Sequence, residues 1–311
     1  MIEVQDLTKK YGELTAVRNL SFRVEAGKIW GLLGPNAAGK TTTMRILTGY
    51  LPATGGKASV AGFDVFEQPD EAKKAIGYLP EVVPLYPEMT VTGYLGFVAE
   101  IKQVPAAKRK AAVAKAIQSA ALDEVRGRLI RNISRGYKQR VGIAQAIIHD
   151  PKVLILDEPT IGLDPAQIRE IRELIKNLRG DHTVLLSTHI LPEVTQLCDG
   201  VVVLNEGRVM ASGSLEELTA FLQQRHAKGG VVIRLRRGGE AAAGLLRRIP
   251  GMEAAVADGG EIRLEWSRDR DLRDEVVRLV AGQDLGLLEM KPMAMNIEDL
   301  YLQIVSGGSE Q

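Results

Sequence analysis

The chain has 311 residues, of which 45% are hydrophobic and 25% are charged, so we expect about two globular domains with a sizeable core. Its 40 basic and 39 acidic side chains give a net charge of +1, which lacks the basic footprint of a nucleic-acid-binding protein. A single cysteine, Cys198, excludes an intrachain disulfide. The sequence opens with no signal-like pattern and contains no apolar run of about 18 residues, so we expect any membrane role to depend on a partner.

The first elements along the chain are predicted from alternating and continuous apolar runs. We expect three strands and one helix before residue 50, at 2–4, 20–24, 29–33 and 42–47. Residues 84–150 look mostly helical, and an amphipathic helix is expected over 106–121. This region is predicted to form a small helical subdomain.

Strands and helices then alternate. Apolar strands are expected at 153–156, 183–187 and 201–204, and a helix over 166–178 lies between the first two. Such alternation favours a mostly parallel α/β sheet. Acidic and basic side chains that follow these strands would lie along the carboxyl edge of the sheet, where ligands of parallel sheets bind.

The composition changes near residue 223. We predict a nucleotide-binding domain over 1–222, a linker over 223–230 and a C-terminal accessory domain over 231–311. The accessory domain has the β-α-β-β-α-β order of ferredoxin-like folds. Its expected elements are 231–235, 241–249, 253–256, 262–266, 272–279 and 287–291, with a turn at 258–260 and a closing helix at 297–305.

A glycine-bearing loop stands between a predicted strand and a predicted helix. It matches the pattern G-x-x-x-x-G-K-[ST] through Gly34, Pro35, Asn36, Ala37, Ala38, Gly39, Lys40 and Thr41. Backbone N–H groups of such a loop surround phosphate oxygens, and the following helix points its positive end at them. Lys40 would contact the β- and γ-phosphates and Thr41 would offer its hydroxyl to Mg²⁺. The lysine, the threonine and the strand–helix context disfavour a chance glycine loop.

Two acids and a histidine follow neighbouring predicted strands. Asp157 is expected to hold Mg²⁺ through water, and Glu158 to orient and help deprotonate an attacking water. The alternative is an acid pair that caps a helix before Pro159. His189 ends the next strand and could reach the same edge, although a lone histidine is more often structural.

In this order, these residues resemble the nucleotide-binding subunits of ABC transporters over roughly residues 1–220. The resemblance identifies Gly34 to Thr42 as Walker A, with Thr42 completing the nucleotide-binding set, and 154–158 as Walker B with its catalytic glutamate. Asp164 falls in the D-loop, His189 matches the switch histidine, and Tyr11 matches the aromatic residue that stacks on adenine. The implied fold is an α/β P-loop NTPase with a mixed sheet and a helical subdomain.

The most family-specific match is the segment 133–140. It is similar to the ABC signature, usually Leu-Ser-Gly-Gly-Gln, through Ser134, Arg135, Gly136 and Tyr137. In the family, the helix that starts here faces the γ-phosphate bound by the other subunit. A helix N-terminus suits such an anion.

Four residues depart from the family pattern. Ala37 replaces a usual glycine, and because a methyl group is costly at positive φ, we expect a φ that alanine tolerates. Arg135 and Tyr137 replace a glycine and a glutamine of the signature. Glu81 replaces the glutamine of the Q-loop; it could still ligate Mg²⁺ but would repel the γ-phosphate. These changes put the turnover rate in question more than the fold.

The resemblance implies an ATPase that drives transport. Residues 77–81, the signature and the C-terminal part, including 296–301, resemble the bacterial branch of drug, sodium and polysaccharide exporters and gliding-motility ATPases. The expected partners are an integral membrane permease, docked through a groove near residues 81–90, and a second copy or paralogue that completes two ATP sites. The chain would then lie peripherally on the cytoplasmic face of the inner membrane.

The sequence argues against three other functions. A soluble ABC ATPase acting on ribosomes or DNA usually carries two nucleotide domains or a long coiled coil, and this chain has neither. A slow regulatory subunit is suggested by the altered signature and by Glu81, but Lys40, Asp157, Glu158 and His189 argue against it. A GTPase would need an Asn-Lys-x-Asp motif that reads guanine, and this sequence has none. The accessory domain is interpreted as a dimer-stabilising or regulatory appendage rather than a ligand sensor.

Overall fold

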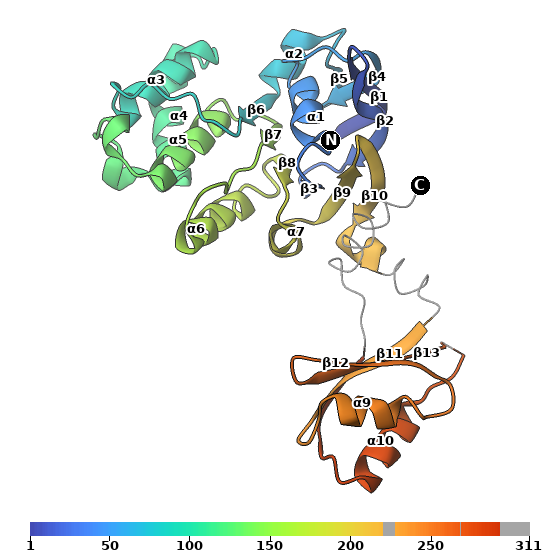
Figure 1. Cartoon of the computed structure of the whole chain (residues 1–311). Helices are drawn as coiled ribbons and strands as arrows, with labels where there is room; N and C mark the ends of the chain where they lie inside the picture. Colours follow the sequence, from blue (N-terminus) through green and yellow to red (C-terminus); the bar gives the residue numbers. More distant parts are fainter. Residues whose placement is uncertain (220–227, 268, 293–311) are drawn as a thin grey trace. The chain divides into compact units, whose positions relative to one another are not determined.

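The computed structural model describes residues 1–219, 228–267 and 269–292. The chain divides into two compact units, and the boundary lies between Leu215 and Glu216 (Figure 1). Among the described residues, no helix combines the length and the apolar character that crossing a membrane requires.

The first unit contains an antiparallel sheet that the sequence predicted only in part. Its strand order is β2-β1-β4-β5. The strands are β1 (Ile2–Tyr11), β2 (Leu14–Val24), β4 (Gly55–Val60) and β5 (Phe63–Asp64). Alternate residues of β1 and β2 point into the core, which is the pattern of strands that bury one face of their sheet.

The second sheet of this unit is mostly parallel, as expected, with the order β10-β9-β3-β8-β7-β6. The strands are β3 (Ile29–Leu33), β6 (Ile76–Leu79), β7 (Val153–Leu156), β8 (Thr183–Thr188), β9 (Gly200–Asn205) and β10 (Arg208–Ser214). Only β10 runs antiparallel to its neighbour. Because β8 lies between β3 and β7, the carboxyl ends of these three strands meet at one edge.

Helices complete the first unit. They are α1 (Lys40–Leu47), α2 (Pro69–Lys74), α3 (Val91–Ile101), α4 (Ala106–Ser119), α5 (Arg135–Ile147), α6 (Pro165–Lys176) and α7 (Leu191–Leu197), with 3₁₀ turns at Asp123–Val125 and Ile130–Asn132. Figure 1 shows α3, α4 and α5 gathered beside β6, which matches the expected helical region. A core formed by side chains of both sheets and of α1 holds the phosphate loop in place.

The second unit confirms the ferredoxin-like expectation. Its elements are β11 (Lys228–Leu235), α9 (Glu240–Leu246), β12 (Met252–Asp258), β13 (Glu261–Ser267), α10 (Arg273–Gly282) and β14 (Leu287–Pro292). The sheet is antiparallel with the order β12-β13-β11-β14. Its core includes Ile233, Leu264 and Trp266 from the strands and Leu246 and Val276 from the helices.

The end of the predicted linker, at residues 228–230, is wrong. Residues 228–230 were assigned to it, but they belong to β11, where they pair with Ser267, Trp266 and Glu265 of β13. Gly229 packs against the Trp266 ring, which leaves no room for a side chain there. Three other expectations lie outside the described residues: the rest of the linker, the closing helix at 297–305 and the tail at 296–301.

Candidate active site

The phosphate loop is held by close backbone packing. A Cβ on Gly34 would clash with the carbonyl oxygen of Leu204 at the end of β9, so the loop can leave β3 in this direction only with a glycine. Gly39 precedes α1 with φ +99°, a region that side chains rarely adopt. Both glycines of the motif are therefore required by geometry.

Our expectation for the backbone of Ala37 is wrong. We expected a φ that alanine tolerates, but its φ is +65°, in the left-handed region. That conformation costs a residue with a Cβ about 1 kcal/mol relative to glycine. The loop therefore keeps the backbone shape that a glycine would favour, and the alanine bears the strain.

Lys40 is the buried cation of the site. It is only 6% exposed, and its Nζ donates to the carbonyl oxygens of Gly34 at 2.8 Å and Pro35 at 3.1 Å. The same nitrogen lies 3.7 Å from Oε1 of Glu158. Burial lowers the pKa of Lys40 below its usual value, and the nearby carboxylate of Glu158 acts in the opposite direction. The amine is thus held at the mouth of the loop, beside the predicted base.

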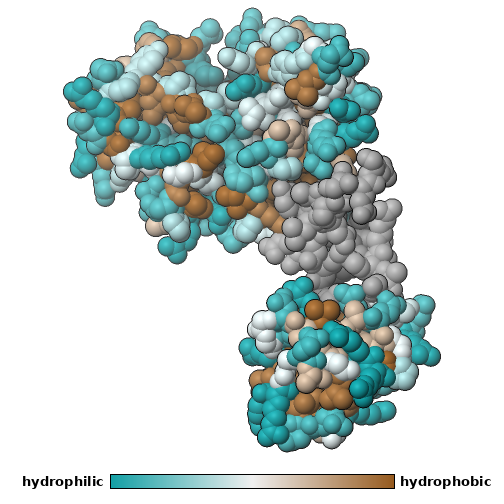
Figure 2. All heavy atoms as spheres, viewed as in Figure 1, coloured by the Kyte–Doolittle hydropathy of each residue, from teal (hydrophilic) through white to brown (hydrophobic). Residues whose placement is uncertain are grey.

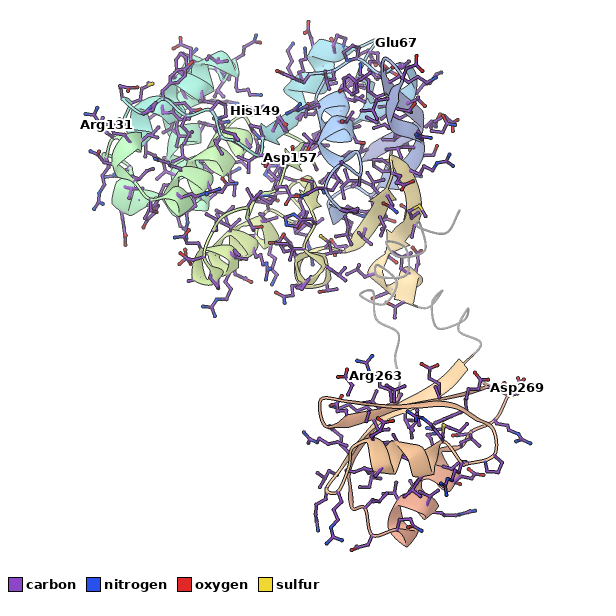
Figure 3. The ribbon with its side chains drawn as sticks, in the orientation of Figure 1. Glu67, Arg131, His149, Asp157, Arg263 and Asp269 are labelled. Atoms are coloured by element: carbon purple, nitrogen blue, oxygen red, sulfur yellow. The ribbon has the colours of Figure 1, made fainter. Side chains whose placement is uncertain are left out.

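The two acids after β7 have different surroundings. Asp157 is 1% exposed, and Oδ1 accepts a hydrogen bond of 2.6 Å from the hydroxyl of Ser187 on β8. That hydroxyl also accepts from the backbone N–H of Glu158 at 2.8 Å. Figure 3 shows Asp157 in the interior of the first unit. Ser187, which we had not singled out, fixes both acids.

His189 lies against the predicted base. Its Nδ1 is 3.1 Å from both carboxylate oxygens of Glu158. Glu158 itself is 7% exposed and has φ +47°, so its backbone is strained in a way that is common at functional sites. The structure therefore brings together Lys40, Glu158 and His189, three residues that lie more than 30 positions apart.

The signature segment begins a helix, as expected, and Ser134 also caps it. The Ser134 hydroxyl accepts from the N–H of Tyr137 at 3.3 Å at the start of α5. Arg135 turns toward its own D-loop: Nη2 donates to the carbonyl oxygen of Ile161 at 3.1 Å, and the guanidinium covers Gly162. Tyr137 points to the helical region, where its hydroxyl donates to Glu124 at 3.2 Å.

The chain that follows Glu158 is fixed at successive residues. Buried Gln139 donates to the carbonyl oxygen of Pro159 at 2.8 Å, and the Thr160 hydroxyl donates to buried Glu193 at 2.5 Å. Sequence reasoning missed Gln139 and Glu193. Each lies on a helix at a position that also suits an ordinary core or surface residue, and its partner lies 20 or 33 positions away.

The remaining predicted residues have contacts of their own. Asp164 caps α6, accepting from the N–H groups of Ala166 and Gln167 at 3.0 and 2.9 Å. Tyr11 ends β1 at a hairpin, is 46% exposed, and has the Lys9 amine 5.2 Å from its ring centre. Glu81 is exposed two residues after β6 and adds to the negative potential at Lys40.

The donor set suits a hard cation that takes further ligands from its substrate. Asp157 and Thr41 offer oxygen atoms, which Mg²⁺ prefers. Within residues 1–219, 228–267 and 269–292, no cluster of three or more histidine, cysteine or acidic side chains forms a metal cage. A magnesium ion here would therefore complete its coordination with phosphate oxygens and water.

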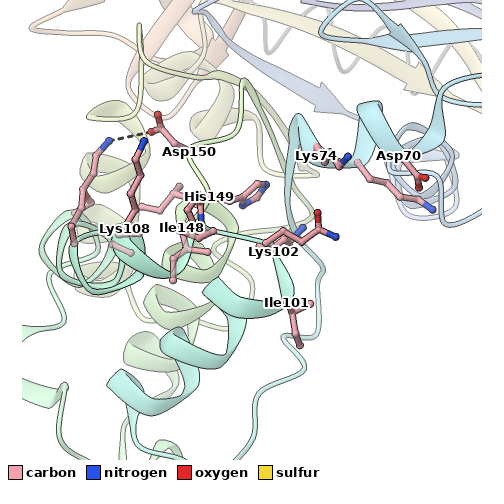
Figure 4. A pocket seen from close by; sticks show the side chains of 18 residues that line it. Asp70, Lys74, Ile101, Lys102, Lys108, Ile148, His149 and Asp150 are labelled. Atoms are coloured by element: carbon pink, nitrogen blue, oxygen red, sulfur yellow. Dashed lines mark hydrogen bonds and ion pairs between the residues drawn. The ribbon is translucent and has the colours of Figure 1, made fainter.

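A cavity of about 1110 Å³ lies away from this edge, between α2 and the helical region (Figure 4). Lys73, Lys74, Lys102 and Lys108 line it, against fewer acidic groups. Burial lowers the pKa of Lys102, and burial with the Lys102 charge lowers the pKa of His149 to about 4. The cavity carries positive charge and does not overlap the phosphate loop.

Comparisons with known proteins find relatives among the ATP-binding proteins of ABC transporters. A family model described as ABC transporter matches residues 17–161. The chain is 32% identical to the bacitracin transport ATP-binding protein BcrA of Bacillus licheniformis, over 99% of this chain and 98% of that one. It is 29% identical to the linearmycin resistance ATP-binding protein LnrL of Bacillus subtilis, over 98% of each. A solved ATP-binding subunit of an ABC transporter is 30% identical with a TM-score of 0.65, covering 73% of this chain and 95% of that one. A dimeric bacterial ABC transporter cassette is 25% identical with a TM-score of 0.62, covering 69% and 99%.

Proposed function

Because this chain belongs to the ABC transporter family and is an ATP-binding ATPase, we propose that it powers export through a separate integral membrane subunit. The observation that carries the proposal is the cluster of Lys40, Glu158 and His189 at one sheet edge. The transport and resistance functions named for the relatives BcrA and LnrL support export of small antibiotic-like molecules.

The proposed reaction is hydrolysis of the γ-phosphate of ATP. Lys40 contacts the β- and γ-phosphates, and the loop from Gly34 to Thr42 surrounds them with N–H groups. Glu158 accepts a proton from water as the water oxygen attacks the γ-phosphorus; the bond to the β-phosphate oxygen breaks, and ADP and phosphate leave. His189 keeps the Glu158 carboxylate in position.

Mg²⁺ would be held by Thr41 and Asp157, with Glu81 as a further candidate ligand. When bound, this ion neutralises the charge that develops on the phosphate oxygens. Asp157 is oriented for this purpose by the hydroxyl of Ser187. Tyr11 is proposed to stack on the adenine ring.

A complete site needs a second subunit. The chain has one phosphate loop and one signature segment, so a second copy or a paralogue would supply Ser134, Gly136 and the start of α5 to each ATP. The D-loop residue Asp164 would lie at the same interface. The accessory unit is proposed to stabilise or regulate this dimer.

The membrane subunit is proposed to dock on the helical region at the cytoplasmic face of the membrane. Val82, Tyr86, Phe97 and Ile101 are large exposed apolar side chains in or near α3. Figure 2 shows patches of hydrophobic residues on this part of the first unit. The adjoining cavity is lined by lysines, so the docking segment is expected to carry acidic residues.

Co-purification tests this proposal. The tagged chain is extracted from native membranes in detergent, and the proteins bound to it are identified. A polytopic membrane protein in about 1:1 ratio is expected, and its yield should fall when Lys102 and Lys108 are both changed to Glu. Recovery of ribosomes, DNA or no partner would instead favour a family member that acts away from the membrane or a regulatory ATP-binding subunit.

A further inference from the structure

A buried carboxylate on α7 joins two segments of the active site. Glu193 is 2% exposed. Its Oε1 accepts from the Thr160 hydroxyl at 2.5 Å, and its Oε2 accepts from the Thr188 hydroxyl at 2.6 Å. Each carboxylate oxygen therefore serves one threonine, and the two threonines come from different segments of the chain.

The two threonines that Glu193 bridges lie next to the predicted catalytic residues in the sequence. Thr160 comes two residues after Glu158, and Thr188 comes directly before His189. The Thr188 hydroxyl also accepts from the N–H of Ile190 at 3.0 Å, so this side chain holds the backbone on both sides of the histidine. Glu193 thus fixes the loop of the predicted base relative to the loop of the predicted switch histidine.

Neutralisation of charge does not explain this arrangement. Arg172 of α6 is the cation near Glu193, at 3.7 Å from Oε1, and its Nη1 donates to Gln196 at 2.6 Å. Its Nε is buried without a hydrogen-bond partner among the described residues. An ion pair built for stability would bring the guanidinium close to both oxygens, whereas here the shortest contacts of Glu193 are with the two hydroxyls.

We propose that Glu193 is a positioning residue for ATP hydrolysis, which sets the distance between Glu158 and His189 by holding Thr160 and Thr188. The inference rests on the proposed roles of Glu158 and His189. The contacts of Glu193 described above are with Thr160, Thr188 and Arg172, and none of them involves Lys40 or the phosphate loop. Loss of Glu193 is therefore expected to act on hydrolysis and to leave the loop that binds ATP intact.

We expect changes at Glu193 to lower kcat but to leave the binding of MgATP nearly unchanged. A shift of about 1 Å in a catalytic group lowers turnover by up to about 100-fold. We expect Glu193→Gln, which keeps the shape but loses one acceptor and the charge, to lower kcat about 10-fold. Glu193→Ala should lower it further. The affinity for MgATP, measured by equilibrium binding, should stay within about twofold because Lys40 and the loop are retained.

The test uses the full-length chain and compares kcat, MgATP affinity and the thermal midpoint of unfolding. Thr160→Val removes one arm of the bridge and should lower kcat, though less than Glu193→Ala. Combining Thr160→Val with Glu193→Gln should give less than the product of the two single losses, because both changes break the same contact. Thr195→Val, an exposed threonine on α7, is the matched control and should behave as wild type.

The outcomes separate a positioning role from a structural one. If folded Glu193→Gln keeps kcat within twofold of wild type, the proposal is overturned, even if its thermal midpoint falls. If Glu193→Gln does not fold, the same criterion applies to Thr160→Val. Failure of the proposed function is a different result, because Glu158→Gln would then hydrolyse ATP like wild type whatever Glu193 does.

Discussion

The two units of this chain differ in whether they bury charged side chains. In the first, Lys40, Asp157, Glu158 and Glu193 are each less than 10% exposed. In the described part of the second, residues 216–219, 228–267 and 269–292, the core is apolar and the ion pairs given for it, such as Arg237 with Asp284, lie on the surface. Burying a charge is costly unless contacts offset it, so a cluster of buried charges marks where a fold sacrifices stability for chemistry. The described residues of the second unit show no such cluster.

The largest effect of a single substitution is expected at Lys40, among the buried charges of the first unit. Lys40→Ala removes the amine proposed to contact two phosphates, and charge-assisted contacts of this kind are each worth about 1.5–3 kcal/mol. We expect ATP affinity to fall about 1,000-fold, or roughly 4 kcal/mol. Equilibrium binding measures this, with exposed Lys28→Ala as the control. Affinity close to wild type would refute the assignment of the phosphate loop.

A core truncation in the second unit should affect stability alone. Leu264 is fully buried in β13, so Leu264→Ala should destabilise this unit by about 3 kcal/mol. Denaturant unfolding measures the loss, and ATP affinity should not change. A large drop in ATP affinity would mean that the second unit contributes to the nucleotide site.

Acid sensitivity should arise in the first unit. Burial lowers the pKa of His149 to about 4, so the unfolded chain binds this proton more readily between pH 6.5 and pH 4. Stability is therefore present above pH 6.5 and is lost as the pH falls through this window. His149→Gln should remove about 1–2 kcal/mol of the loss between pH 7 and pH 5, allowing for partial exposure. Equal pH dependence in both proteins would contradict this cause.

The smallest effect is expected at a surface ion pair of the second unit. Arg237 and Asp284 lie 3.1 Å apart with exposed side chains. Exposed pairs contribute little because water and salt screen them. Asp284→Asn should change the free energy of unfolding by less than about 0.5 kcal/mol. A loss above 1 kcal/mol would show that this unit also depends on charge.

Local patterns predicted those parts of the molecule that depend on neighbours in sequence. The phosphate loop, the acids after β7 and His189 each follow a recognisable apolar strand, and parallel strands place such residues on one edge. The ferredoxin-like order was predicted for the same reason, since each strand and helix carries its own period. Strand β11 was placed three residues late because its glycines resemble a linker, whereas their pairing with β13 makes them a strand.

Contacts across the fold could not be predicted from one sequence. Nothing near Glu193 shows that Thr160, 33 positions away, will donate to it. Arg135 was recognised as a departure from the signature, but its contact with the Ile161 carbonyl depends on how α5 packs on the D-loop. The positive φ of Ala37 is imposed by the loop as a whole, against the preference of the residue.

The central claim is that buried Glu158 activates the water that hydrolyses ATP. The most direct test is the steady-state ATPase rate of Glu158→Gln, which keeps the size of the side chain, beside exposed Glu173→Gln as the control. We predict a fall of at least about 100-fold with ATP still bound, and accumulation of an ATP-dependent dimer by light scattering. Hydrolysis at the wild-type rate would contradict the account and assign the base elsewhere.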